Sequence, residues 1–378
     1  MVEKNQDEEV NNKPVDKILV GSVIVLVSVG LLMILSASSI RAIHEHNDAY
    51  YYFRRQTIFA LAGTAIMFIF SRVDYRIYLK YSRRLVLTAL GLLILVLIPG
   101  VGRTAHGARR WLDLGLFDFQ PSELAKLVSI IYISSFIYRK NNRIKSFFMG
   151  ILPPMIVVTA IFLLVAYQPD LGTGITIFAA AITLLIIGGM RFRHLLLIAL
   201  PGNAFLIFYI TRASYRLERI MTFIDPWRDP QGAGYHIIQS LMALGAGGIT
   251  GVGPGGSRQK FLYLPEPGTD FIYAILGEEL GFIGAAIVLI LFLIIGWRGA
   301  LISRRAPDLF GSMLAAGITV MICLQAIINI GAVTSLLPVT GITLPFISYG
   351  GSSLLIMLVS VGILLNVSRN CSGRSEKI

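Results

Sequence analysis

Carboxylates and one lysine stand where apolar stretches begin, and these positions suit proton transfer and anion binding. Asp270 ends the run Leu264–Asp270 and precedes an apolar stretch at 271–296. A carboxylate at a helix start can cap the helix and complement its dipole. A partly buried carboxylate at the boundary between water and membrane can also act as a general base, because burial favours the protonated form. The residues alone leave both interpretations of Asp270 open.

A glutamate and a lysine begin a second apolar stretch, at 123–138. Glu123 and Lys126 are three residues apart and therefore share one face of a helix. One interpretation is a lysine that reaches toward the interface and pairs with its neighbour. The other is a cation directed into a cavity, held by Glu123 and used on a diphosphate. Asp170 precedes the stretch 171–189 in the same way, and capping alone would account for it.

Further polar residues interrupt the apolar stretches themselves. Glu278 and Glu279 lie deeper in the stretch that follows Asp270, and Gln325 and Asn329 are four residues apart in a later one. Polar side chains at membrane depth face protein rather than lipid. We therefore expect Glu278 or Glu279 to be a hydrogen-bonding residue inside a helical bundle, and Gln325 and Asn329 to form a polar stripe that faces protein.

Composition excludes most other classes of protein. Of 378 residues, 55% are hydrophobic and 14% are charged, and the mean hydropathy is +0.73. Soluble proteins are about 25% charged, so a soluble globular enzyme, a disordered chain and a secreted disulfide scaffold are excluded. The two cysteines, Cys323 and Cys371, form neither a disulfide framework nor a zinc site. What remains is a protein that crosses a membrane several times.

Apolar stretches recur often enough to predict an all-helical, polytopic membrane protein with about ten spanning helices. We place these helices at 17–38, 57–71, 85–99, 123–138, 151–167, 171–189, 194–211, 271–296, 310–333 and 350–367. Two long segments connect them, at 100–122 and at 212–270. The domain organisation is then one membrane domain over 17–368 between two short tails, 1–16 and 369–378.

The placement of basic residues orients this bundle. With the N-terminus inside, 20 of the 33 lysines and arginines fall in inner segments, and half of the 12 outer ones lie in 212–270. Cytoplasmic segments of membrane proteins are enriched in lysine and arginine. Both tails are therefore expected in the cytoplasm, with the long outer segment between the seventh and eighth helices. This rule also explains the net charge of +12 without any nucleic-acid partner.

The segment 245–256 is rich in glycine, and residues 251–256 formally match the pattern G-x-G-x-x-G. A dinucleotide site is rejected because no strand–helix–strand unit surrounds the pattern. A flexible hinge and a backbone that approaches a ligand phosphate remain as alternatives. The residues thus predict an outward-opening polar cavity suited to a membrane-embedded anionic ligand such as a lipid diphosphate. Its expected rim cations are Arg109, Arg110, Arg216, Arg219, Arg258 and Lys260.

Long motifs in these same regions resemble the SEDS family, the shape, elongation, division and sporulation proteins of bacteria. The resemblance begins near residue 17. The motifs that carry it are Gly107–Leu127, Gln168–Thr173, Arg219–Trp227, Gly234–Leu241, Ser257–Gly281 and Gln325–Ser353. Gly234–Ser240 and Leu264–Ile272 look closer to the division and sporulation branch than to the elongation branch. Asp118 departs from the family, whose members often carry a basic residue there, and His236 replaces a frequent glutamine.

The resemblance implies a peptidoglycan glycosyltransferase that polymerises lipid II at the outer face of the bacterial cytoplasmic membrane, for a division or sporulation septum. An inverting reaction would release undecaprenyl diphosphate. Asp270 falls on the essential aspartate of the family, the expected general base. The expected substrate-binding residues are Lys126, Glu123, Arg109, Arg110, Asp170, Arg216, Arg219, Ser257, Lys260 and Glu266.

The resemblance also implies partners and a cofactor. A class B penicillin-binding protein, which is a transpeptidase, and division proteins are the expected partners. A divalent cation, Mg²⁺ or Mn²⁺, is the expected cofactor, and no organic cofactor is expected, although no complete set of metal ligands stands out. Two alternatives stay open: a lipid II flippase, and a non-catalytic scaffold that recruits the transpeptidase.

Overall fold

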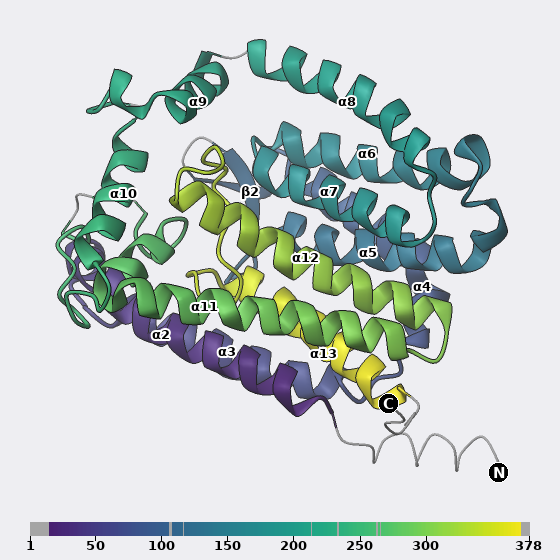
Figure 1. Ribbon diagram of the computed structural model, residues 1–378, viewed down its shortest axis with the longest axis horizontal. Helices are drawn as coiled ribbons and strands as arrows, with labels where there is room; N and C mark the ends of the chain where they lie inside the picture. Colours follow the sequence, from purple (N-terminus) through teal and green to yellow (C-terminus); the bar gives the residue numbers. More distant parts are fainter. Residues whose placement is uncertain are drawn as a thin grey trace.

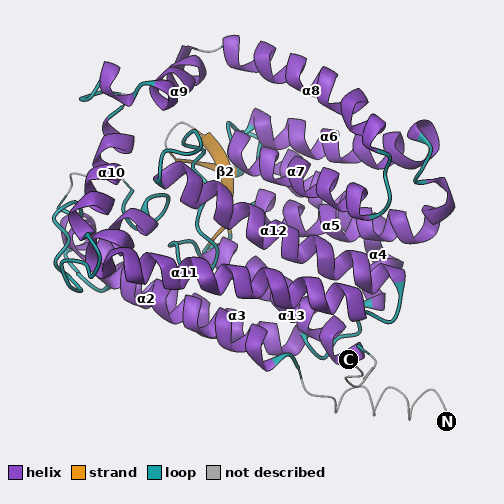
Figure 2. Cartoon of the chain, viewed as in Figure 1, coloured by secondary structure: helices purple, strands orange, loops and turns teal. Residues whose placement is uncertain are grey.

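A computed structural model of the chain describes residues 15–105, 108–115, 117–212, 214–232, 234–261, 264 and 266–371. Within these ranges, the side chains of residues 104, 105, 203, 206, 209, 210, 214–216, 219 and 220 are not described. The structure is mostly helical (Figures 1 and 2).

Long helices coincide with all ten predicted stretches. They are α2 (Lys17–His46), α3 (Tyr51–Phe70), α4 (Arg76–Leu95), α5 (Pro121–Lys140), α6 (Leu152–Tyr167), α7 (Leu171–Ile187), α8 (Phe192–Thr211), α11 (Ile272–Arg305), α12 (Leu309–Val333) and α13 (Gly351–Asn370). Five of the described helical segments are long and apolar enough to cross a membrane: α2, α6 together with the π-helical turn Phe147–Ile151, α11, α12 and α13. The predicted fold class is confirmed, whereas the number of ten crossings stays a prediction.

The segment 212–270 contains two helices that the sequence analysis did not predict. They are α9 (Ser214–Ile224) and α10 (Tyr235–Gly247). Figure 1 shows that α8 runs along the upper edge of the bundle and continues through α9 to α10, which packs on α11.

A small antiparallel sheet, which the sequence analysis did not predict, lies in the segment 100–122 beside the helical bundle. Its strands are β1 (Gly102–Ala105), β2 (Ala108–Asp113) and β3 (Asp118–Phe119), in that spatial order. The Ser352 hydroxyl at the start of α13 donates to the Asp118 carbonyl oxygen at 2.6 Å, which joins the sheet to the bundle. Because these strands are short and lie between apolar helices, hydropathy gives little sign of them.

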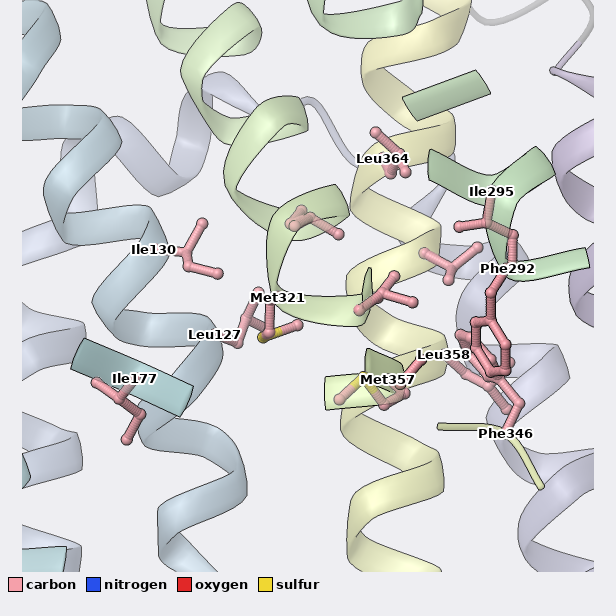
Figure 3. Close-up of a cluster of buried hydrophobic side chains, with 14 of the residues drawn as sticks. Leu127, Ile130, Ile177, Phe292, Ile295, Met321, Phe346, Met357, Leu358 and Leu364 are labelled. Carbon is pink, nitrogen blue, oxygen red and sulfur yellow. The ribbon is translucent and has the colours of Figure 1, made fainter. Parts of the chain in front are cut away.

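The core of the bundle forms where α5, α7, α12 and α13 meet (Figure 3). Leu127 and Ile130 of α5 face Met321 of α12 in this buried cluster. A methyl group on Gly317 of α12 would lie 2.5 Å from Ile130 Cγ2, so the glycine permits the close approach of α12 and α5. In a membrane such close packing replaces the hydrophobic effect as the force that holds helices together.

The two ends of the described chain meet at one end of the bundle. Asp16 caps α2 by accepting a hydrogen bond from Leu19 N at 3.0 Å, and its second carboxylate oxygen pairs with Arg298 at 2.6 Å. The Asp16 amide also reaches the Ser368 hydroxyl at 3.4 Å. Asp16 and Ser368 therefore lie at the same end of the bundle.

A break within α11 explains the glycine-rich segment. Gly281 has φ +66° and ψ −168°, outside the helical region. The amides of Val252 and Gly253 donate to the carbonyl oxygens of Glu278 and Glu279, both at 3.0 Å. A Cβ on Gly251 would lie 2.2 Å from the Glu279 carbonyl oxygen. The glycines therefore allow a close approach to the chain's own backbone, a partner that neither sequence-based alternative included.

Candidate functional site

Asp270 lies in the turn before α11, and its side chain is partly buried. The capping interpretation is wrong for this residue, because α11 begins at Ile272 and its N-cap residue is Phe271. The turn is fixed from the segment before α13: Tyr349 N donates to the Gly268 carbonyl oxygen at 2.9 Å, and the Ser348 hydroxyl donates to that of Thr269 at 2.6 Å. Two hydrogen bonds from this segment thus fix the backbone of the turn that carries Asp270.

Asn329 of α12 fixes Asp270 from a second direction. Its amide nitrogen donates to the Asp270 carbonyl oxygen at 2.8 Å and to the Ile342 carbonyl oxygen at 2.7 Å. Gly341 has φ +72°, and a Cβ added there would lie 3.6 Å from Asp270 Oδ2. The segment around 341 therefore lies against the Asp270 carboxylate.

Lys126 of α5 is held in the bundle interior, where only 3% of it is exposed. Its ammonium contacts Glu123 Oε1 at 2.9 Å and donates to Gln325 Oε1 at 2.6 Å. Gln325 in turn donates to the Thr343 carbonyl oxygen at 3.0 Å. Within the described part of the chain, Glu123 Oε2 is buried without a hydrogen-bond partner. The second interpretation of this pair, a lysine directed inward and held by Glu123, fits this geometry.

One helix connects the two groups. Gln325 contacts Lys126, Asn329 contacts Asp270, and the two amides are four residues apart on α12. Four residues rise about 6 Å along a helix. The prediction that Gln325 and Asn329 face protein is confirmed, because both are buried, but the sequence analysis gave no partners for them.

Asp170 and Arg110 join the sheet to the start of α7. Asp170 is buried and caps α7, since it accepts a hydrogen bond from Thr173 N at 3.2 Å, so the capping prediction is confirmed. Its other oxygen accepts one from Gln120 Nε2 at 3.2 Å. Arg110 Nε donates to the Gln168 carbonyl oxygen at 3.0 Å. Arg109, its neighbour on β2, is exposed.

Ser257 and Lys260 lie in a buried polar cluster with the glutamates of α11. Ser257 Oγ and Arg258 N donate to the Glu278 carboxylate. Lys260 pairs with Glu279 Oε1 at 3.1 Å. The sequence analysis expected Glu278 or Glu279 to be an interior hydrogen-bonding residue, and the structure shows that both are.

The remaining predicted residues lie elsewhere. The Glu266 carboxylate pairs with Arg41 of α2 at 2.8 Å and accepts from the Thr269 hydroxyl at 3.1 Å, so it supports the turn that carries Asp270. Arg216 and Arg219 belong to α9, but their side chains lie outside the described ones.

The described side chains do not fit the metal site implied by the resemblance. Among them, no three histidine, cysteine, aspartate or glutamate side chains come together as ligands would. No step of the reaction below is therefore assigned to a metal, and the requirement for Mg²⁺ or Mn²⁺ stays a prediction.

Comparisons with known proteins find relatives that match nearly the whole chain. A family model described as a cell cycle protein, covering FtsW, RodA and SpoVE, matches residues 16–373. The chain is 48% identical to stage V sporulation protein E of Bacillus subtilis (strain 168), over 94% of this chain and 97% of that protein. It is 43% identical to the probable peptidoglycan glycosyltransferase FtsW of Geobacter sp. (strain M18), over 95% and 98%.

Two solved structures share the fold. One is a chain from a peptidoglycan synthase complex, solved to describe the structural coordination of polymerization and crosslinking, with a TM-score of 0.78, 29% identity and coverage of 95% of this chain and 99% of that one. The other is the rod shape determining protein RodA of Thermus thermophilus, with a TM-score of 0.70, 26% identity and coverage of 95% and 98%.

Proposed function

The chain belongs to the FtsW, RodA and SpoVE family of cell cycle proteins, and we propose that it is a peptidoglycan glycosyltransferase that polymerises lipid II. Homologues of similar length carry the name peptidoglycan glycosyltransferase. One observation carries the assignment to this site: α12 anchors both a partly buried aspartate, at 2.8 Å from Asn329, and a buried lysine, at 2.6 Å from Gln325. Glycosyl transfer from a diphosphate needs a base for the acceptor and a cation for the leaving group.

In the proposed step, the Asp270 carboxylate accepts the proton of the 4-hydroxyl of one lipid-linked disaccharide. The same hydroxyl oxygen attacks the anomeric carbon of the growing glycan. The bond from that carbon to the diphosphate oxygen breaks, and undecaprenyl diphosphate leaves. Attack on the face opposite the leaving group inverts the anomeric centre and gives the β-1,4 linkage.

Lys126 supplies positive charge for the leaving diphosphate. An ammonium has three N–H donors, and the described contacts of Lys126 use two of them, to Glu123 and Gln325. The third donor is available for a diphosphate oxygen. Glu123 and Gln325 fix the ammonium before substrate arrives, so little reorganisation is needed as charge develops on the leaving group.

The site opens to the outer face of the membrane in this proposal. The basic residues of the inner segments support that orientation, since Lys126 and Asp270 both lie at helix starts that follow outer segments. A class B penicillin-binding protein is the proposed partner, and the similarity to a chain of a peptidoglycan synthase complex supports it. Septal action, in division or sporulation, is supported by the similarity to stage V sporulation protein E.

Polymerisation of labelled lipid II tests the proposal. The full chain is purified with its penicillin-binding protein, and the glycan products are separated on a gel. We expect a ladder from wild type and none from Asp270→Ala. Asp113→Asn is the matched control, because the Asp113 carboxylate is exposed and only accepts from Gly115 N at 2.7 Å, a bond that asparagine keeps.

The alternatives give different results in the same preparation. A flippase would move lipid II across liposome membranes without any ladder. A scaffold would form the complex and show neither activity. An undiminished ladder from Asp270→Ala would refute the general base while leaving the polymerase intact.

A further inference from the structure

A cavity lies between the turn that precedes α6, at residues 145–147, and the start of α8. Its volume is about 660 Å³. Its cationic lining residues are Lys145, Arg191 and Arg193. Asp170 and Arg191 flank opposite ends of α7, whose 17 residues span about 25 Å, so this cavity and the glycosyltransferase site lie at opposite ends of the bundle. The basic residues around it put this end in the cytoplasmic leaflet.

The charge of this cavity is uncompensated. None of its lining residues is acidic, and the described part of the chain offers its three cations no ion pair. Another cavity, of about 550 Å³, lies beside β2 and β3 and differs from the first in the charge of its lining residues. It also holds arginines, but Asp113 and Asp118 line it, and Arg103 pairs with Asp118 at 2.9 Å. The lining of the first cavity therefore carries three cations and no anion, whereas the lining of the second carries three arginines and two aspartates.

A buried histidine in the same lining lacks a partner. His194 is 3% exposed, and its ring lies 5.8 Å from that of Phe147. Its Nδ1 has no hydrogen-bond partner among the described residues. Buried polar atoms in folded proteins nearly always have a partner, so an orphaned imidazole nitrogen beside a cavity indicates a missing ligand. The start of α8 at Phe192 adds the partial positive charge of a helix N-terminus.

Apolar side chains continue outward from the cavity. Leu197 lines it, and the neighbouring Phe148, Phe192 and Leu196 are exposed. On a helix bundle in a membrane, exposed aromatic and leucine side chains face acyl chains. A ligand with an anionic head and an apolar tail would satisfy both parts of this surface.

We propose that this cavity binds a phosphate group, with Lys145, Arg191 and Arg193 as its counter-ions and His194 as a hydrogen-bonding partner. An anionic phospholipid of the cytoplasmic leaflet and free phosphate carry the same group. Basic pockets between membrane helices on the cytoplasmic side are suited to phospholipid headgroups. Such a site would couple the protein to the lipid composition of the leaflet opposite the one where polymerisation is proposed.

Binding to the full chain in nanodiscs tests the site. Phosphatidylglycerol is titrated into nanodiscs of phosphatidylcholine, and inorganic phosphate is titrated separately. The cavity variant is Lys145→Gln/Arg191→Gln/Arg193→Gln. The matched control is Lys80→Gln/Arg83→Gln/Arg84→Gln, which removes the same charge from the exposed inner end of α4. A third variant, His194→Phe, keeps an aromatic ring against Phe147.

We expect the cavity variant to weaken phosphatidylglycerol binding at least about tenfold, and the control by less than about twofold. His194→Phe should weaken it about threefold, since one hydrogen bond to a charged group is lost. Saturable binding of phosphatidylglycerol but not phosphate identifies a lipid site, and binding of both identifies a general phosphate site. The proposal is overturned if neither ligand binds, or if the control variant loses as much affinity as the cavity variant.

Discussion

Two buried lysine–glutamate pairs of this bundle differ in how completely they are satisfied. Lys260 donates to Ser36 Oγ at 3.0 Å, to the Gly255 carbonyl oxygen at 2.6 Å and to Glu279 Oε1 at 3.1 Å. All three of its N–H groups have partners, and Glu279 Oε1 also accepts from the Ser36 hydroxyl at 2.5 Å. This pair fastens the glycine-rich segment to α2 and to the break in α11.

In the other pair, Lys126 with Glu123, one hydrogen-bond donor and one acceptor have no partner in the described structure. Its lysine has two described acceptors, and the second oxygen of its glutamate has none in the described structure. Both lysines are almost equally buried, at 3% and 6% exposed. Burial therefore does not distinguish a ligand-binding cation from a structural one, whereas the number of unused donors and acceptors does. This criterion supports Lys126 as the proposed cation for substrate and a structural role for Lys260, which the sequence analysis had placed in the same class.

The largest effect is expected when the Lys126 pair is neutralised as a unit. In Glu123→Gln/Lys126→Met no unpaired charge is left buried, so most of the stability should be kept. The rate of lipid II polymerisation should fall at least about 100-fold, because one charge-assisted contact to the leaving group is lost. Initial rates from gel ladders and the midpoint of thermal unfolding in detergent measure the two quantities. A rate within about threefold of wild type would show that Lys126 is structural.

The Lys260 pair should respond in the opposite way. Lys260→Met leaves Glu279 buried and unpaired, which should lower the free energy of unfolding by about 3 kcal/mol. Lys260→Met/Glu279→Gln should recover most of that loss, because the orphaned charge is removed. The polymerisation rate per folded molecule should stay within about threefold of wild type in the double variant. A large loss of polymerisation rate in this stable double variant would instead indicate that Lys260 acts on substrate.

Replacing Asn329 should lower the kcat of polymerisation more than replacing a similarly buried asparagine, Asn366, that lies away from Asp270. Asn329→Ala removes the bonds to the carbonyl oxygens of Asp270 and Ile342, so Asp270 loses its anchor to α12. We expect about a thirtyfold loss in kcat, since about 1 kcal/mol of positioning is lost for each of the two bonds.

Asn366→Ala is the matched control for that variant. Asn366 is also buried and also bridges two backbone groups, because it accepts from Tyr75 N at 2.9 Å and donates to the Ser71 carbonyl oxygen at 3.0 Å. It lies at the other end of the bundle. Equal losses of kcat in the two variants would mean that Asn329 acts through general stability alone.

The smallest effect is expected at Asp170, whose side chain is satisfied within the fold. Asp170→Asn keeps an oxygen for the Thr173 amide, so its stability and rate should stay close to those of wild type. Asp170→Ala should lose about 1 kcal/mol of stability with the cap. Loss of polymerisation in a stable Asp170→Asn protein would instead indicate that the negative charge acts on substrate.

The positions of the long helices could be predicted from the sequence, because length and hydropathy identify a membrane-spanning segment. Prediction failed where structure depends on contacts between distant segments. The sheet that contains Arg110 and the helices α9 and α10 are not formed by apolar stretches long enough to cross a membrane, so hydropathy does not reveal them. The break at Gly281 depends on a backbone approach from Gly251, some 30 residues earlier, which no local pattern contains.

The types of residue in the site could be predicted from the sequence, but the contacts between those residues could not. Asp270 and Lys126 stand out because ionisable side chains at membrane boundaries are costly. That α12 joins them follows only from the packing of α5, α11 and α12. Glu123 could be predicted as the partner of Lys126 because it lies three residues away, whereas Glu279 lies 19 residues from Lys260 and comes within reach only after folding.

The pH dependence of polymerisation tests the role of Asp270 most directly. The rate of wild type should fall toward low pH with a slope of one, as a single carboxylate becomes protonated and stops accepting the acceptor's proton. The residual rate of Asp270→Asn should be far lower and should lose this acidic limb. An acidic limb that persists unchanged in Asp270→Asn would contradict the assignment of Asp270 as the general base.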